Sequence, residues 1–294
     1  MPPAAPIAVR FLLFDGFQPI DLSGPWQAFT TANEEAGSPC YELRTVGLSA
    51  TAVSADGGLS IAVSAPLADA AAGHTVIVPG GPGVHEISGH AGVVAWLRQA
   101  DRTTRRTCSV CTGAFVLAAA GLLDGRRVTT HWRSARRLRE AYPRLEVDDE
   151  LLYCESGKYW TTAGVTAGID LALALIERDF GADLSLRVAR RLVVYLRRDG
   201  DQRQYSQALR LQDKMAAPFR ELLGRIENSL DLDWSVDRMA ECCGMSRRSF
   251  QRKFTASTGV SPMAALVSLR REQAGLLERG GALSRKAIAR SVGL

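Results

Sequence analysis

Short apolar segments alternate with helical segments along the first 183 residues, and this alternation limits the fold more than any other feature of the chain. The apolar segments lack a helical period, which is typical of buried strands. Strands separated by helices usually form a parallel sheet with helices on both faces, so we expect an α/β domain over residues 7–183. The expected strands are 7–14, 41–46, 75–79 and 106–110, and the expected helices are 21–36, 91–101, 113–120 and 166–180.

The chain changes character near residue 183. Almost no strand signal follows, Asp199 to Gln202 is polar and turn-like, and helical periods resume at Ala217. Residues 1–183 contain 15 Lys and Arg against 20 Asp and Glu, whereas residues 184–294 contain 21 against 11. A basic region can bind nucleic acid, but it can also be an ordinary solvated face. We expect a helical linker over 184–214 and an all-helical domain over 215–294.

Composition and targeting signals exclude several classes of protein. The chain has 294 residues, 46% hydrophobic and 23% charged, as in a soluble globular protein. No segment reaches the roughly 18 apolar residues of a transmembrane helix, and the N-terminal six residues form a short lead without the basic start of a secretion signal. We therefore expect a cytoplasmic protein. The six cysteines and four histidines have no metal-ligand spacing, and we expect neither a metal nor a cofactor.

A sequence repeat with an offset of 49 residues lies in the second part of the chain. Ser235 to Met245 aligns with Ser284 to Leu294, and each copy has a serine, an apolar residue followed by alanine, and a glycine at equivalent positions. A capping serine, a small residue for close helix approach and a glycine turn are typical of the first half of a helix-turn-helix. Because two copies flank an expected long helix, 262–278, we predict two helix-turn-helix units.

A second helix follows the first copy of the repeat, with Phe250 and Phe254 on its inner face. Its outward face carries side chains suited to the major groove, because arginine pairs with guanine, glutamine pairs with adenine, and lysine can hold phosphate. The alternative is an ordinary solvated helix face. The predicted DNA-binding residues are Arg247, Arg248, Gln251, Arg252 and Lys253.

Residues 215–294 resemble the AraC family of transcription regulators. The resemblance rests on 232–244, on Met245 to Phe254 and on Thr258 to Pro262. It implies two helix-turn-helix units on one linker helix, with Arg248, Gln251 and Arg252 at base-contacting positions. The chain departs from the family pattern because the second copy stops at Leu294, where its base-contacting helix would begin. We therefore expect a truncated second unit and weakened DNA binding.

A candidate nucleophile lies between an expected strand and an expected helix, in the segment Ser109 to Gly113. This context is typical of a nucleophile elbow, and Cys111 would lie at a helix start, where the helix dipole favours a thiolate. The segment 80–83, with Gly81, follows another strand and could supply oxyanion-hole N–H groups, as could Thr112. The alternative is a buried structural cysteine, the role that we expect for Cys108.

The first 183 residues resemble the ThiJ/PfpI superfamily, which has the class I glutamine amidotransferase-like fold. Together with the AraC-like tail, this resemblance implies the GlxA-type branch of AraC regulators. Within the superfamily, isonitrile hydratase is the enzyme with the most similar pattern at Asp21-Leu22 and Cys111-Thr112. The motifs that carry the resemblance are Leu22 to Pro25, Val78 to Gly81, Ser109 to Gly113, Ala120 to Gly125, Thr129 to Trp132 and Thr162 to Gly164.

The chain also departs from the peptidase-type members of this superfamily. They place a histidine directly after the cysteine, where this chain has Thr112. His131 could approach Cys111 or could be a core histidine, and Asp21 could act in a site or, like Ser23, cap the helix that Gly37 ends. A complete Cys-His-carboxylate triad is therefore not evident. We predict a pocket at the carboxyl ends of the strands, formed by Asp21, Gly81, Cys111, Thr112 and His131.

Three functions fit these patterns. The first is a DNA-binding transcription regulator, with a sensor domain that binds a small-molecule effector and forms a homodimer. The second is a hydratase or amidohydrolase that uses Cys111 and Asp21, for which the basic tail would be incidental. The third is a redox sensor based on Cys111, because thiolates of low pKa oxidise readily. The duplicated helix-turn-helix favours the first.

Overall fold

The structure is a computed structural model that describes residues 5–49, 51–69, 73–194, 217–279 and 284–294. It divides into two compact units, Met1–Gln204 and Tyr205–Leu294. The predicted turn at 199–202 and most of the predicted linker lie outside the described residues. In the described ranges, no helix combines the length and the apolar character needed to cross a bilayer.

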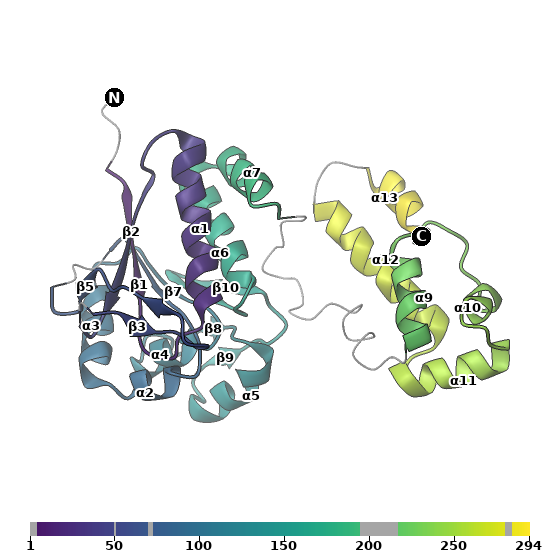
Figure 1. The fold of residues 1–294 in the computed structure, drawn as a ribbon, viewed down its shortest axis with the longest axis horizontal. Coiled ribbons are helices and arrows are strands. Elements are labelled where there is room, and N and C mark those ends of the chain that lie inside the picture. The colour runs from purple at the N-terminus through teal and green to yellow at the C-terminus, as the bar shows by residue number, and fades with distance from the viewer. Residues whose placement is uncertain (1–4, 50, 70–72, 195–216, 280–283) are drawn as a thin grey trace. The chain divides into compact units, whose positions relative to one another are not determined.

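A mostly parallel seven-stranded sheet forms the centre of the first unit (Figure 1). The strand order is β10-β11-β7-β6-β1-β2-β5, and each neighbouring pair is parallel except β10 and β11. This confirms the predicted α/β fold. The strands of the sheet are β1 (Ile7–Leu12), β2 (Tyr41–Gly47), β5 (Ala65–Pro66), β6 (Thr75–Val78), β7 (Arg106–Ser109), β10 (Tyr153–Ser156) and β11 (Tyr159–Thr162).

Helices cover both faces of the sheet, as expected. On one face α1, α6 and α7 pack together, and α2, α3 and α4 form a second group (Figure 1). The helices are α1 (Pro19–Ala36), α2 (Val84–Ser88), α3 (Ala91–Asp101), α4 (Gly113–Ala119), α5 (Trp132–Ala141), α6 (Ala167–Phe180) and α7 (Ala182–Arg191). Short strand pairs β3 (Val53–Ser54) with β4 (Ser60–Ile61), and β8 (Arg127–Val128) with β9 (Glu146–Val147), lie outside the main sheet.

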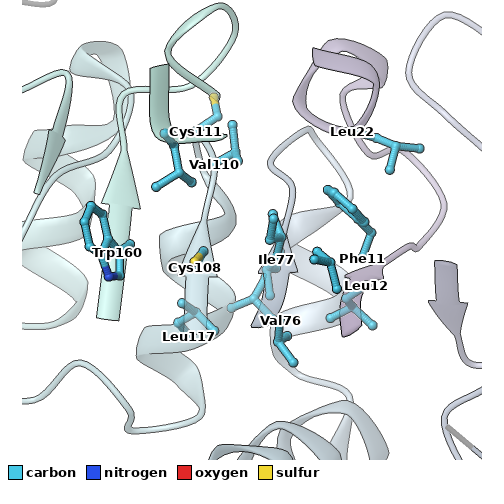
Figure 2. Packing of buried hydrophobic residues seen from close by; sticks show 14 of the residues in the cluster. Phe11, Leu12, Leu22, Val76, Ile77, Cys108, Val110, Cys111, Leu117 and Trp160 are labelled. Atoms are coloured by element: carbon cyan, nitrogen blue, oxygen red, sulfur yellow. The ribbon is translucent and has the colours of Figure 1, made fainter. Parts of the chain in front are cut away.

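The core of the sheet consists of strand residues with no exposed area, because a parallel sheet is covered on both faces. Phe11, Ile77 and Cys108 come from three neighbouring strands and are fully buried (Figure 2). Cys108 therefore has the structural role that its position predicted. The core also includes Leu184 and Val188 of α7. The first unit thus extends beyond the boundary expected at residue 183.

The structure corrects the predicted cap of α1. This helix begins at Pro19, with Gln18 at the N-cap, so Asp21 and Ser23 both lie inside the helix. Pro19 explains the difference, because proline is favoured at the first helical position, where no hydrogen bond from its nitrogen is needed. The predicted stop is confirmed: Gly37 ends α1 in the left-handed conformation, with φ of 65°. Asp21 therefore does not cap α1, and its carboxylate is buried.

The second unit is all-helical in its described residues, as expected. Its core is formed mainly by aromatic and aliphatic side chains, among them Phe219, Phe250 and Phe254, whose ring centroids lie 5.4–5.9 Å apart. The helices are α9 (Ala217–Glu227), α10 (Val236–Cys242), α11 (Arg247–Thr258), α12 (Pro262–Arg279) and α13 (Arg285–Val292).

Candidate functional sites

A strained elbow joins β7 to α4, at the place where the sequence predicted a nucleophile elbow. Cys111 has a φ of 56°, in the left-handed region that few residues other than glycine adopt. Its carbonyl accepts a hydrogen bond from the Thr130 hydroxyl at 2.8 Å. Figure 2 shows Cys111 beyond the end of β7, whereas Cys108 lies within the sheet. The elbow geometry is therefore confirmed.

Asp21 lies next to the elbow and holds two loops. Its carboxylate accepts hydrogen bonds from Gly80 N–H and from Val165 N–H, each at 3.0 Å. Gly80 follows β6 and Val165 follows β11, so one buried carboxylate joins the carboxyl ends of two strands. Burial raises the pKa of Asp21 from 3.8 to about 6, although the two hydrogen bonds favour the charged form.

The thiol of Cys111 is not the thiolate that its position predicted. Burial, and after it the negative charge of Asp21, raise the pKa of the Cys111 thiol to about 12. Hydrogen bonds from Thr112 act in the opposite direction but do not overcome the shift. The prediction from the helix dipole was wrong because α4 has only seven residues and the sulfur is desolvated. Cys111 is therefore a protonated thiol at neutral pH.

The predicted oxyanion hole is corrected at the glycine loop, whereas the role predicted for Thr112 stays a prediction. The N–H of Gly81 donates to the Thr112 hydroxyl at 2.9 Å, and the N–H of Gly80 donates to Asp21. Both N–H groups therefore have side-chain acceptors, whereas an oxyanion hole needs donors directed at an open position. Gly81 and Thr112 do lie together beside Cys111, as predicted, but their contact stabilises the elbow.

A cavity of about 120 Å³ adjoins the elbow, and its wall is formed mainly by the segment that follows β11. Gly164 packs against Cys111 so closely that a Cβ at Gly164 would lie 2.2 Å from the Cys111 Cβ. Of the five residues predicted to form a pocket, His131 is among the residues that line this cavity, whereas Asp21 and Cys111 contact its wall at Val165 and Gly164. The lining residues are His131, Trp132, Leu152, Ala163, Gly164, Val165, Thr166 and Ala167.

His131 caps a helix instead of pairing with the thiol. Its Nδ1 accepts a hydrogen bond from the Arg133 N–H at 3.3 Å at the start of α5, and its ring stacks on Trp132. Burial, together with the charge of Arg133, lowers the pKa of His131, so the ring is neutral at pH 7. The contact between this segment and the elbow runs through Thr130. In the described part of the chain, no cluster of three or more His, Cys, Asp or Glu side chains could hold a metal ion.

The raised pKa of Asp21 leads to a prediction about stability. Because the folded state binds this proton more tightly than the unfolded state, the stabilisation is complete below about pH 4 and is lost as the pH rises through about 6. The loss is about 3 kcal/mol, since the pKa differs by about two units. Urea unfolding from pH 4 to 7.5 should show this extra slope in the wild type relative to Asp21→Asn. Parallel stability curves would contradict the assignment.

The raised pKa of Cys111 leads to a second prediction. In variants that each retain one cysteine, iodoacetamide should modify Cys111 more slowly than the partly exposed Cys242 at pH 7. The Cys111 rate should still increase with pH at pH 9, because the thiolate fraction is still rising there. A Cys111 rate that reaches a plateau below pH 8 would show that the thiol is acidic after all.

Both copies of the sequence repeat form the same local structure in the second unit. The Ser235 hydroxyl accepts a hydrogen bond from the third residue of α10, and the Ser284 hydroxyl accepts the equivalent bond in α13. The apolar positions Met239 and Ile288 are buried in both copies. Each helix ends before a glycine of positive φ, 61° at Gly244 and 73° at Gly293. The predicted repeat is therefore confirmed.

The second helix of the first helix-turn-helix, α11, presents all five predicted DNA-binding side chains to solvent. Its inner face is buried through Phe250 and Phe254, as expected. Arg247 is exposed and forms an ion pair with Asp237 of α10 at 2.8 Å. The other four predicted residues are exposed: Arg248, Gln251, Arg252 and Lys253.

Comparison with known proteins connects these two units. Residues 8–178 match the DJ-1/PfpI family, and residues 226–266 match the bacterial regulatory helix-turn-helix proteins of the AraC family. The HTH-type transcriptional regulator GbdR of Pseudomonas aeruginosa is 31% identical over 90% of this chain and 72% of its own length. The chain belongs to the AraC-family regulators with an N-terminal DJ-1/PfpI domain. This AraC-family regulator therefore binds DNA and regulates transcription.

Two further relatives match this AraC-family regulator over different lengths. The HTH-type transcriptional regulator GlxA of Rhizobium meliloti is 28% identical over 97% of this chain and 88% of its own length. The isonitrile hydratase of Pseudomonas putida is 33% identical over 60% of this chain and 74% of its own length. The first match extends over both units, and the second has the length of the DJ-1/PfpI domain.

Proposed function

We propose that the DJ-1/PfpI domain senses a small-molecule effector and thereby controls DNA binding by the helix-turn-helix unit. The cavity beside the elbow supports this proposal most directly. Its wall, residues 163–167, is tied to Asp21 through the Val165 N–H and packs on Cys111 through Gly164. A molecule in the cavity would contact the segment that connects both, and a sensor needs such differential contact to change its conformation.

The cavity limits the size and chemistry of the effector. About 120 Å³ corresponds to about four water molecules, so the effector is a small molecule or a small group of a larger one. Polar groups come from His131, Trp132 and Thr166, and apolar surface comes from Leu152 and Ala163. Trp132 is 44% exposed and Val165 is 38% exposed, so the cavity has a partly apolar mouth. We therefore favour a small polar metabolite with one short apolar part.

A homodimer in the cytoplasm completes the proposed function. Helix-turn-helix regulators commonly bind paired half-sites as dimers, so two copies would present two DNA-binding units to one operator. The mass of the full chain in solution, with and without operator DNA, tests this part of the proposal. A species of one chain mass in both states would contradict it.

DNA binding in the presence of candidate effectors tests the sensor. Operator DNA is first selected from a random library with the full chain, and its affinity is then measured against a panel of small metabolites. Trp132→Ala should retain basal DNA binding but lose the response to the active compound. Arg136→Ala is a matched control, because Arg136 lies on the same helix and its side chain is 87% exposed. A normal response of Trp132→Ala would exclude this cavity as the effector site.

A second candidate function is hydration of a small unsaturated substrate. Asp21 lies beside Cys111, and its pKa of about 6 suits a group that exchanges protons near neutral pH. The 33% identity with an isonitrile hydratase supports this candidate. Incubation of the full chain with isonitriles, followed by detection of the formamide product, tests it. Product formation that persists in Cys111→Ala would remove the thiol from the reaction.

A further inference from the structure

Arg270 of α12 holds the loop that leads into the first helix-turn-helix. Its Nε donates to the Leu230 carbonyl at 3.0 Å, and its Nη2 donates to the Leu232 carbonyl at 2.8 Å. Both carbonyls belong to the loop between α9 and α10. Hydrogen bonds from a guanidinium to carbonyls are stronger than neutral ones, and two from one planar group fix direction as well as distance. Arg270 thus ties this loop to α12 through two hydrogen bonds.

The same guanidinium lies against the turn that ends α13. A Cβ at Gly293 would lie 2.6 Å from Arg270 Nη2 and 2.6 Å from the Leu230 oxygen. At the equivalent turn of the first copy, Gly244, a Cβ would meet no atom within 4 Å. The second copy of the repeat is therefore docked on Arg270 and Leu230, and the first copy has no such contact at its glycine.

We infer that Arg270 is a positioning residue that fixes α13 relative to the first helix-turn-helix. Its guanidinium contacts the loop before α10 on one side and the turn after α13 on the other. The exposed face of α13 carries Arg285, Lys286 and Arg290, cations suited to phosphate contacts. DNA-binding units that contact one face of the duplex must match its helical repeat. Arg270 therefore determines which spacing between the two contacted DNA segments is preferred.

Operator variants with altered spacing test this inference. One or two base pairs are inserted between the two segments that a single chain protects in one half-site of a selected operator, and the affinity of the full chain is measured for each length. The affinity of the wild type should be at least about tenfold higher for its own spacing than for the altered ones, a difference of about 1.4 kcal/mol. Arg270→Gln should reduce this discrimination several-fold, and Arg270→Lys should restore part of it.

A matched control separates positioning from loss of charge or of stability. Arg271 is the exposed neighbour of Arg270, so Arg271→Gln removes the same charge and should keep the spacing preference. A variant that is merely less stable binds all spacings more weakly by one common factor. Such a common factor for Arg270→Gln, or an unchanged spacing preference in it, would overturn the inference. A wild type without any spacing preference would overturn it as well.

Discussion

Gly164→Ala is expected to lower the free energy of unfolding of the DJ-1/PfpI domain by about 2–6 kcal/mol, the largest stability effect that we foresee. Gly164 has a φ of 92°, which a residue with a Cβ adopts only under strain. The added Cβ would also lie 2.2 Å from the Cβ of Cys111, which belongs to the strained elbow and has little freedom to move. Steric overlap therefore adds to the conformational cost.

Gly37→Ala separates these two contributions. Gly37 also has a positive φ, 65°, but a Cβ there would meet no atom within 4 Å. The Gly37→Ala variant should therefore lose only the conformational part of the free energy of unfolding, about 1–2 kcal/mol. Urea unfolding of the full chain, followed by tryptophan fluorescence, measures both variants. Equal losses would show that the elbow adapts to the new Cβ and that the contact between Gly164 and Cys111 is loose.

Arg252→Ala is expected to weaken binding to the selected operator by about 1–3 kcal/mol, or roughly 5- to 150-fold. Arg252 lies on the exposed face of α11, opposite the buried Phe250 and Phe254. An arginine that pairs with guanine also sets the base preference at that position. The variant should therefore tolerate substitutions at one base pair that the wild type rejects.

Lys253→Ala is the matched comparison for Arg252→Ala. If Lys253 contacts phosphate, its loss should weaken binding to all sequences alike and reduce the slope of log affinity against log salt by about 1. Binding curves for both variants over a salt series and a set of single-base operator variants distinguish the two roles. If Arg252→Ala retained the base preference of the wild type, Arg252 would be a phosphate contact and another residue of α11 would determine specificity.

The sequence predicted the central strands and the elbow because both depend on local pattern. The run from Val76 to Val78 is apolar and short, which favours a buried strand, and a strand followed at once by a small-residue helix is typical of an elbow. The edge of the sheet was missed. β10 and β11 contain Glu155, Thr161 and Thr162, so neither forms a continuous apolar run, although threonine itself favours strands. In the structure, β11 pairs in parallel with β7, and β10 forms the edge of the sheet beside β11.

The protonation states in the candidate site could not be predicted from the sequence. A cysteine at a helix start favours a thiolate only if solvent or a cation stabilises the charge, and the surroundings of Cys111 do neither. Asp21 had the sequence context of a helix cap, but Pro19 moved the helix start and left the carboxylate buried between two loops. The burial of Asp21 depends on residues distant in sequence, such as Val165, and hydrophobic periodicity does not predict which distant segments come into contact.

The elbow at Cys111 has a consequence for how enzymes are recognised from structure. Its backbone is held by neighbours, because the Thr130 hydroxyl donates to the Cys111 carbonyl and Gly164 packs closely against the Cys111 Cα and Cβ. Shape and acidity at such a turn are therefore separable, and each can change in evolution while the other is retained. A search that detects active sites from backbone geometry alone would select this chain, although its thiol is buried and the nearby Gly80 and Gly81 N–H groups already have side-chain acceptors.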